Sequence, residues 1–433
     1  MLGTITLIIA LGAQLALLVY RLRTKNTQTK ARNMMRIAGF LAFSLLLLAG
    51  VYWWGFRWMG LFITLAVLAL LGALGLVRPP KTQQAFRASR AVLSCVSGCF
   101  LLAFGILPGI IFPQFAAVQA TGELAAETTS YTYIDSSRVD PFSEKGENRK
   151  LTVQFWYPAN TDAATFPLVV FSHGAFGFRG SNLSTFENLA SHGYVVCSID
   201  HSYQSFFASH ADGSRTLIKT DFLNDAVNVQ NGAYGPQTSY QITSEWLALR
   251  TADMAFVLDT VLAQAASATS EPVFALINPE EIGLFGHSLG GATAAAIGRE
   301  RSNIDAVVVI DGTMLGERIG TADGQTSLIT EPYPLPLLNL YNDSHYQTAR
   351  SEGTAYENIS ASTNAIEAYD VVIRDSGHLN FTDLPLFSPL LARMLGTGTV
   401  DSRYCIETMN DLVLRFFDYA LKGAAPLDLQ ITY

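Results

Sequence analysis

Ser288 lies in the stretch "EIGLFGHSLGGATAAAIG", residues 281–298, where Gly286 and Gly290 flank it at a distance of two residues. A serine hydroxyl becomes a nucleophile when a base takes its proton, and that base needs an orienting acid. The stretch has the pattern of a buried strand, a sharp turn and a helix of small residues that can approach a sheet closely. We therefore predict that Ser288 occupies a nucleophile elbow.

Two backbone donors are expected near this serine. The elbow places the N–H of Leu289 at a helix N-terminus, where unsatisfied donors and the helix dipole favour negative charge. A second donor is expected after a His-Gly pair that follows an earlier strand. The segment "VVFSHGAFGF" (169–178) fits and nominates the N–H of Ala175. Each such donor stabilises a developing oxyanion by roughly 3 kcal/mol.

The base and the acid should follow the serine in the order acid, then histidine. Of the seven histidines, His345 and His378 follow Ser288. His378 comes directly after a strand-like run, so we predict it as the base and His345 as a loop or substrate-site residue. For the acid, Asp311 and Asp343 each end a strand-like run, and the pattern favours neither.

Other polar residues receive structural interpretations. Arg250 and Asp253, three residues apart on a predicted helix, are expected to form an ion pair. No spacing of His, Cys and Asp suggests zinc, and we expect neither a metal nor a cofactor. Cys197 lies in a predicted buried strand and Cys405 has no obvious partner, so a disulfide between them is left open.

The elements that must position these residues alternate between strands and helices, which predicts the α/β class with a mostly parallel sheet wrapped by helices. Several strand-like runs are continuously apolar, as in strands covered on both faces. The predicted strands are 150–158, 166–174, 193–201, 281–288, 304–312, 335–343 and 368–378, and the predicted helices are 182–192, 244–265, 289–301 and 405–422.

One segment interrupts this alternation. Residues 202–243 are rich in Ser, Asn, Gly and Gln, with interspersed aromatic side chains, and are predicted to be an irregular insert or partial lid over a site. Residues 121–130 are polar and are predicted to be a linker. The α/β domain is accordingly placed at 131–433.

The first 120 residues form a different kind of region. Residues 1–122 contain 11 Lys and Arg and no Asp or Glu, whereas the rest contains 17 basic and 36 acidic residues. Four uncharged apolar runs in this region approach the ~20 residues that a helix needs to cross a bilayer. These predicted transmembrane helices are about 2–20, 37–54, 58–77 and 91–113.

Basic residues predict how these helices are oriented. Six lie in 21–36 and four in 78–90, so both loops are expected in the cytoplasm and the α/β domain outside it. A signal peptide is disfavoured because no basic stretch precedes the first apolar run. The acidic C-terminal part argues against binding to nucleic acid.

With these residues in place, residues 150–385 resemble the plasma-type platelet-activating-factor acetylhydrolases and related bacterial lipases and polyester hydrolases, which are α/β-hydrolases. The resemblance rests on "VVFSHGAFGFRG", "LASHGYVVCSIDH", "GLFGHSLGGATA", "VVVIDGTM" and "DSGHLNFTDLPL". It implies Ser288 as nucleophile, His378 as base and Asp311, rather than Asp343, as acid. It also places the oxyanion donors at Ala175 and Leu289. The predicted transmembrane helices and the insert depart from the family.

The expected protein is thus a membrane-anchored serine hydrolase of carboxylic esters, with the α/β-hydrolase domain outside the cytoplasm. An anchor would hold the site near membrane lipid, which favours an amphiphilic ester substrate.

The same triad would also serve an acyltransferase or a peptidase, because the acyl-enzyme is common to all three. A transporter or scaffold with a hydrolase-like sensor domain is the alternative from another class. The apolar runs contain no charge of the kind that marks a substrate pathway.

Overall fold

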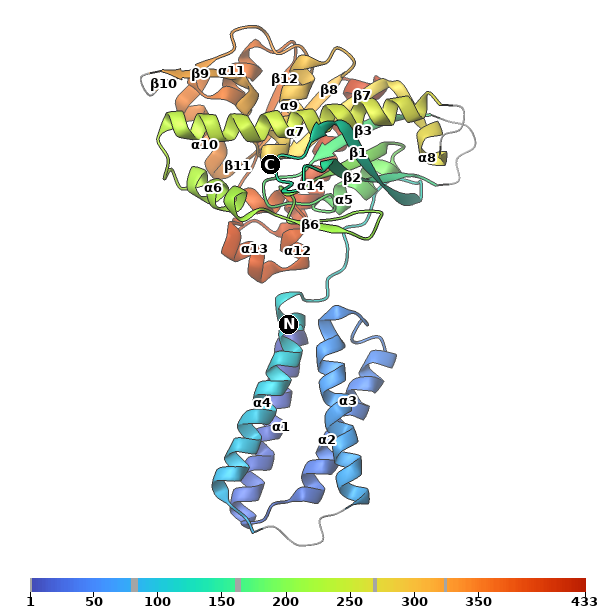
Figure 1. The fold of residues 1–433 in the computed structure, drawn as a ribbon, viewed down its shortest axis with the longest axis vertical. Coiled ribbons are helices and arrows are strands. Elements are labelled where there is room, and N and C mark those ends of the chain that lie inside the picture. Colours follow the sequence, from blue (N-terminus) through green and yellow to red (C-terminus); the bar gives the residue numbers. More distant parts are fainter. Residues whose placement is uncertain (1, 79–84, 160–164, 268–270, 323–324) are drawn as a thin grey trace. The chain divides into compact units, whose positions relative to one another are not determined.

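The computed structural model describes residues 2–78, 85–159, 165–267, 271–322 and 325–433. These residues fall into two compact units (Figure 1). The helical unit comprises 1–116 with 386–392, and the α/β unit comprises 117–385 with 393–433.

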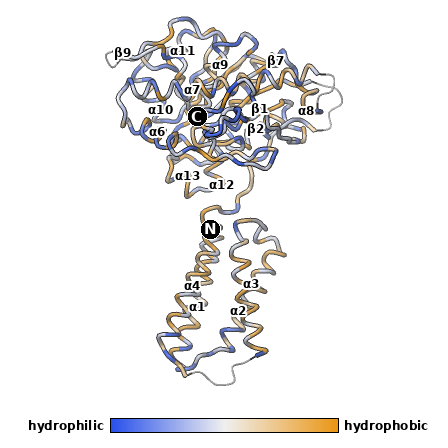
Figure 2. The backbone as a smooth tube through the Cα atoms, in the orientation of Figure 1, coloured by the Kyte–Doolittle hydropathy of each residue, from blue (hydrophilic) through white to orange (hydrophobic). Residues whose placement is uncertain are grey.

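Four long helices form the helical unit, and each is long and apolar enough to cross a membrane, with a mean hydropathy between 1.4 and 2.5. Figure 2 shows apolar residues along all four. They are α1 (Leu2–Thr24), α2 (Thr29–Leu48), α3 (Phe56–Val77) and α4 (Ala88–Ile111). They overlap the four predicted runs, although α2 begins earlier than expected, includes the polar segment 29–36, and ends at Leu48 rather than at about 54.

Small residues let these helices approach closely, as is common between helices in lipid. A Cβ atom added at Gly105 of α4 would lie 3.1 Å from the Cα atom of Leu61 in α3. A Cβ atom at Gly109 would lie 2.7 Å from the ring of Trp58, which is fully buried. The close approach of α3 and α4 therefore requires residues without a side chain at these two positions.

The α/β unit is organised around an eight-stranded sheet with strand order β1-β2-β4-β3-β7-β8-β11-β12. From β4 to β12 neighbouring strands run parallel, whereas β1–β2 and β2–β4 are antiparallel. The strands are β1 (Ala126–Val139), β2 (Asn148–Pro158), β3 (Phe166–Ser172), β4 (Val195–His201), β7 (Ile277–His287), β8 (Ala306–Ile310), β11 (Leu337–Asn342) and β12 (Ala368–Ile373). The predicted mostly parallel α/β fold is confirmed.

Helices cover both faces of this sheet. Successive strand residues point to opposite sides, so each face carries apolar side chains that a helix layer can bury. Leu168 and Val170 of β3 pack in one core cluster, and Val169 and Phe171 pack in the other. The first cluster is covered by α7 (Pro236–Ala265), α8 (Pro272–Ala275), α9 (Leu289–Glu300) and α11 (Glu357–Asn364), and the second by α5 (Leu183–Ser191) and α14 (Ser402–Lys422). The remaining helices are α6 (Thr220–Gln230), α10 (Asp343–Glu352), α12 (Leu384–Phe387) and α13 (Pro389–Leu395).

Two expectations about local structure were wrong. Strand β1 begins at Ala126, inside the segment predicted as a linker, and pairs with β2 along most of its length. The segment predicted to be irregular, 202–243, contains the hairpin β5 (Phe207–Ser209) and β6 (Arg215–Leu217), the helix α6 and the start of α7. A second small hairpin joins β9 (Arg318–Ala322) to β10 (Gln325–Leu328).

Cys197 and Cys405 do not form a disulfide. Cys197 and Cys405 are both buried as free thiols. Cys197 packs in the cluster on one face of the sheet and Cys405 in the cluster on the other. The sheet itself therefore separates the two sulfur atoms.

Candidate active site

The residues predicted to do chemistry gather at one edge of the sheet. Strands β3, β7, β8, β11 and β12 are neighbours and parallel, so their carboxyl ends meet at the same edge. Ser288 directly follows β7, and Asp311 directly follows β8. His378 lies in the turn after β12 and begins a short 3₁₀ helix, His378–Phe381.

Ser288 has a strained backbone in the tight turn between β7 and α9. Its φ is 56° and its ψ is −124°, an unusual conformation for a residue with a side chain. A Cβ atom at Gly286 would lie 2.2 Å from the backbone of Gly290, and one at Gly290 would lie 1.8 Å from the carbonyl oxygen of Ser172. The two glycines are thus required by close backbone approach on both sides of the serine.

His378 bonds to Asp311 and not to Asp343. Its Nδ1 lies 2.6 Å from Oδ2 of Asp311, whose side chain is fully buried. Asp343 instead forms an ion pair with Arg374 at 2.9 Å, in which the Arg374 side chain is half exposed. The structure therefore brings together Asp311 and His378, the pair that the resemblance favoured over Asp343.

Four donors converge on the buried carboxylate of Asp311. Besides His378, they are Nδ1 of His345 at 2.8 Å, the backbone N–H of Asn342 at 2.8 Å and Nδ2 of Asn342 at 2.6 Å. Burial acts to raise the pKa of Asp311, but the bonds from His345 and His378 outweigh it and hold the pKa below its usual range. Asp311 is therefore an anion that accepts bonds and does not donate one.

His287, the residue before Ser288, holds the loop that carries His378. Its Nε2–H donates to the carbonyl oxygen of His378 at 3.0 Å, and the two rings lie 4.5 Å apart between centroids. Burial, with a further contribution from nearby His378, lowers the pKa of His287 to about 3. His287 is thus a neutral ring that connects the turn at Ser288 to the loop of His378, a contact that we did not predict.

The loop after β3 passes close to Ser288. A Cβ atom added at Gly174 would lie 3.2 Å from the Cβ atom of Ser288. Ala175 is the next residue in this loop, and Leu289 is the first residue of α9, with Ser288 as its N-cap. The loop that carries Ala175 thus passes beside Ser288 at Gly174, and Leu289 follows Ser288 directly in the chain.

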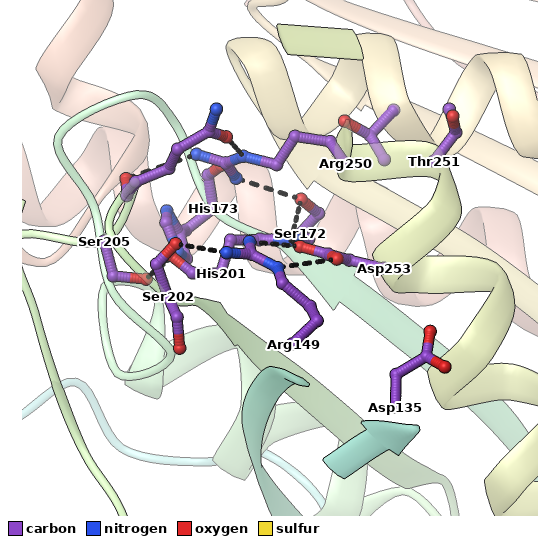
Figure 3. Close-up of polar contacts among 12 residues, drawn as sticks. Asp135, Arg149, Ser172, His173, His201, Ser202, Ser205, Arg250, Thr251 and Asp253 are labelled. Atoms are coloured by element: carbon purple, nitrogen blue, oxygen red, sulfur yellow. Dashed lines mark hydrogen bonds and ion pairs between the residues drawn. The ribbon is translucent and has the colours of Figure 1, made fainter. Parts of the chain in front are cut away.

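A buried polar network holds the loop that follows β3 in place (Figure 3). Arg250 of α7 donates from Nη1 to the carbonyl oxygen of His173 at 2.9 Å and from Nε to Oε1 of Gln204 at 2.7 Å. Nε2 of His173 lies 2.7 Å from Oγ of Ser205. Both Arg250 and His173 are fully buried. The turn after β4 and helix α7 thus support the segment that carries Ala175.

Arg250 and Asp253 do not bond to each other among the described ion pairs, so that prediction was wrong. Asp253 instead accepts two bonds from Arg149, at 2.7 and 3.1 Å (Figure 3). It also forms an ion pair with Arg138 at 3.0 Å. It also bonds to Nδ1 of His201 at 2.9 Å. These partners come from β1, β2 and β4, so Asp253 connects α7 to the antiparallel part of the sheet.

Removing the charge of Asp253 should destabilise the fold. We expect Asp253→Asn to lower the free energy of unfolding by about 3 to 5 kcal/mol, because the buried Arg149 would lose one of its two carboxylate partners and keep only Asp140. Thermal unfolding of the variant measures this loss. Asp259→Asn is the matched control, since this exposed residue of α7 pairs with Arg301 at the surface and should change stability by less than about 1 kcal/mol. Equal losses in the two variants would contradict the assignment.

The bond between His345 and Asp311 was not predicted, since His345 was expected to be a loop or substrate-site residue. A signal was present, since His345 closely follows a strand-like run and the ends of adjacent parallel strands meet. Only the strand order shows that β11 lies next to β8.

The described residues contain no group of three or more His, Cys, Asp or Glu side chains arranged to hold a metal ion. A parallel sheet that presents a serine on a strand–helix elbow is the architecture of the α/β-hydrolases. The solved structure of a ferulic acid esterase from Streptomyces cinnamoneus has this fold. It is 22% identical to this chain, with a TM-score of 0.56, and the match covers 72% of this chain and 95% of that one.

Residues 148–425 match the family model "Platelet-activating factor acetylhydrolase, isoform II", and the chain belongs to this family. The platelet-activating factor acetylhydrolase of Canis lupus familiaris is 25% identical over 265 residues, and that of Bos taurus is 24% identical over 276 residues. Each match covers 58% of this chain and 56% of the relative. The chain therefore spans little more than half the length of the curated relatives that it matches.

Proposed function

We propose that this protein is a serine hydrolase of carboxylic esters, with Ser288 as nucleophile, His378 as base and Asp311 as the acid that orients His378. The observation that carries the proposal is the 2.6 Å bond between Nδ1 of His378 and the buried carboxylate of Asp311, at the same sheet edge as the strained elbow of Ser288. Membership in the acetylhydrolase family supports the same reaction class.

The first half of the reaction transfers the acyl group to the enzyme. Oγ of Ser288 attacks the ester carbonyl while Nε2 of His378 takes its proton. The negative charge that develops on the carbonyl oxygen is stabilised by the N–H groups of Ala175 and Leu289. The tetrahedral intermediate then expels the alcohol, which receives the proton from His378 and leaves an acyl ester on Ser288.

The second half returns the enzyme to its starting state. Water attacks the acyl ester while His378 takes one of its protons, and collapse of the second intermediate releases the carboxylic acid. Ser288 recovers its proton from His378. Throughout, Asp311 accepts the bond from Nδ1–H of His378, which keeps Nε2 facing the reaction and stabilises the imidazolium when it forms.

The helical unit supports a membrane anchor with the hydrolase domain outside the cytoplasm. All four helices are long and apolar enough to span a bilayer, and the basic residues concentrate around the α1–α2 and α3–α4 connections, in 21–36 and 78–90. Proximity to lipid favours an amphiphilic ester with a short acyl chain, in keeping with the name of the family. The ester consists of an acyl part and an alcohol part, and only the acyl part becomes attached to Ser288.

Hydrolysis of p-nitrophenyl esters from acetate to palmitate by the full chain in detergent tests this function. We expect the shortest acyl chains to be cleaved at least about tenfold faster than palmitate, as differential burial of methylenes in a pocket allows. Preference for palmitate would favour a lipase, and absence of any turnover would contradict the proposal.

The same assay with a charged, membrane-impermeant ester should give equal rates with intact and lysed cells. A rate that appears only after lysis would place the domain inside.

A further inference from the structure

Asp311 is shared by two histidines, and the proposed mechanism uses only one of them. His345 lies in the first turn of α10, and its Nδ1 is 2.8 Å from Oδ1 of Asp311, while His378 binds Oδ2. The side chain of His345 is 13% exposed and that of His378 is 36% exposed. His345 is thus the more shielded member of the pair, and its contact with the proposed triad is through Asp311.

The hydrogen bonds define where the protons of His345 lie. The Asp311 anion only accepts, so Nδ1 of His345 carries the hydrogen that it donates. In neutral His345 the other ring nitrogen, Nε2, is an acceptor, and it lies 2.7 Å from the hydroxyl of Tyr356. That hydroxyl lies 2.8 Å from Oγ1 of Thr313. In this neutral form, donation runs from Thr313 to Tyr356, to His345 and on to Asp311.

The fold holds His345 in this position from several sides. Asn342 is the N-cap of α10, and its Oδ1 accepts the backbone N–H of His345 at 2.9 Å. The imidazole packs against the rings of Tyr341 and Tyr356, with centroid separations of 5.0 and 5.6 Å. Asn342 also bonds to Asp311 through two donors, so the end of β11 and the start of α10 form one rigid support for the carboxylate.

The other charged groups near this chain of bonds are already paired. Glu357, next to Tyr356, forms an ion pair with Arg318. Asp343, which begins α10, pairs with Arg374. Asp311 is therefore the carboxylate that His345 contacts, and no other described ion pair includes His345.

We propose that His345 is a positioning residue of the catalytic apparatus: its Nδ1–H orients the carboxylate of Asp311 toward His378 and offsets part of its negative charge. This inference rests on the proposed function, because it concerns the base that activates Ser288. Without the bond, the uncompensated carboxylate stabilises protonated His378 more strongly. The base then becomes protonated at a higher pH, and the neutral form that Ser288 needs is depleted.

Two amide variants separate this role from a general need for a polar side chain. In His345→Asn the amide nitrogen can take the place of Nδ1 and donate to Asp311, although the contact with Tyr356 is lost. In His345→Gln the amide lies farther from the backbone, where it can reach Tyr356 but not replace Nδ1. Both variants are polar and close to histidine in size, so both should fold, which circular dichroism and thermal unfolding verify.

The measurement is the pH dependence of two rates for the full chain in detergent: ester hydrolysis, and covalent labelling of Ser288 by a fluorophosphonate. For His345→Gln we expect both rates to fall about tenfold at neutral pH, with the acidic limb of each profile about half a pH unit higher than in the wild type. For His345→Asn we expect rates within about twofold of wild type and an unmoved acidic limb.

The outcomes distinguish this inference from the proposed function. Unmoved profiles in His345→Gln, or equal defects in the two variants, would overturn the positioning role while leaving the hydrolase proposal intact. Labelling of Ser288 without turnover of any ester would contradict the proposed reaction, and the labelling profiles would still decide the role of His345. Failure of Ser288 to react in the wild type would overturn both, since there would be no activated serine to support.

Discussion

Ser288→Ala is expected to lower kcat for ester hydrolysis by about 10⁵-fold, to a residual rate supported by the oxyanion donors and by substrate binding alone. The alanine removes the oxygen that would carry the acyl group and leaves no other nucleophile at the elbow. The loss should appear in kcat rather than in KM, because Oγ forms its bond to substrate only after binding. Steady-state hydrolysis of p-nitrophenyl acetate, with full-length protein, measures both constants.

Ser351→Ala is the matched control, since Ser351 is an exposed residue of α10 and its loss should leave kcat within about twofold of wild type. Both variants should unfold at nearly the same temperature as the wild type. Retention of more than a few per cent of kcat in Ser288→Ala would rule out Ser288 as the nucleophile. The strained backbone at this position would then require another explanation.

Asp311→Asn is expected to lower kcat by about 10⁴-fold at neutral pH. An asparagine can present an amide N–H to Nδ1 of His378, which favours the tautomer with its hydrogen on Nε2, and that nitrogen can no longer take the serine proton. The substitution also removes the anion that stabilises the imidazolium formed during the reaction. Asparagine has nearly the same size, so the defect should reflect lost charge and altered tautomer rather than a cavity.

Asp343→Asn provides the decisive comparison, because Asp343 also follows a strand of the same sheet. Its partner is Arg374 at the surface, so we expect kcat within about twofold of wild type and a change in stability below about 1 kcal/mol. The pair of variants is compared by kcat and by thermal unfolding. A larger catalytic loss in Asp343→Asn than in Asp311→Asn would reverse the assignment of the acid.

Asp311→Asn should also change the pH dependence of stability. The pKa of Asp311 is lowered in the folded protein, so the group stabilises the fold above its ordinary unfolded pKa, about 4, and loses this contribution as the pH falls. The stability difference between wild type and Asp311→Asn should therefore shrink on acidification. Urea unfolding at neutral and at acidic pH measures it, and a difference that grows in acid would contradict the assignment of Asp311 as a stabilised anion.

Local patterns in the sequence were enough to predict the main elements. Continuous apolar runs predicted the central strands, because a strand covered on both faces needs no polar alternation. The two glycines and the small residues around Ser288 predicted the elbow, since only such residues permit the close backbone contacts at Gly286 and Gly290. Strand β1 was missed because its exposed, polar sequence has few apolar residues and its structure depends on pairing with β2.

The tertiary structure decided which of several suitable side chains meet. Asp311 and Asp343 end similar strands, and the sequence pattern did not separate them; the structure brings Asp311 within 2.6 Å of His378. Strand order likewise brings His345 to Asp311, and the packing of α7 directs Asp253 toward Arg149 rather than Arg250. Sequence spacing determines which residues share an element or a face, whereas contacts between elements depend on strand order and helix packing, which local periodicity does not encode.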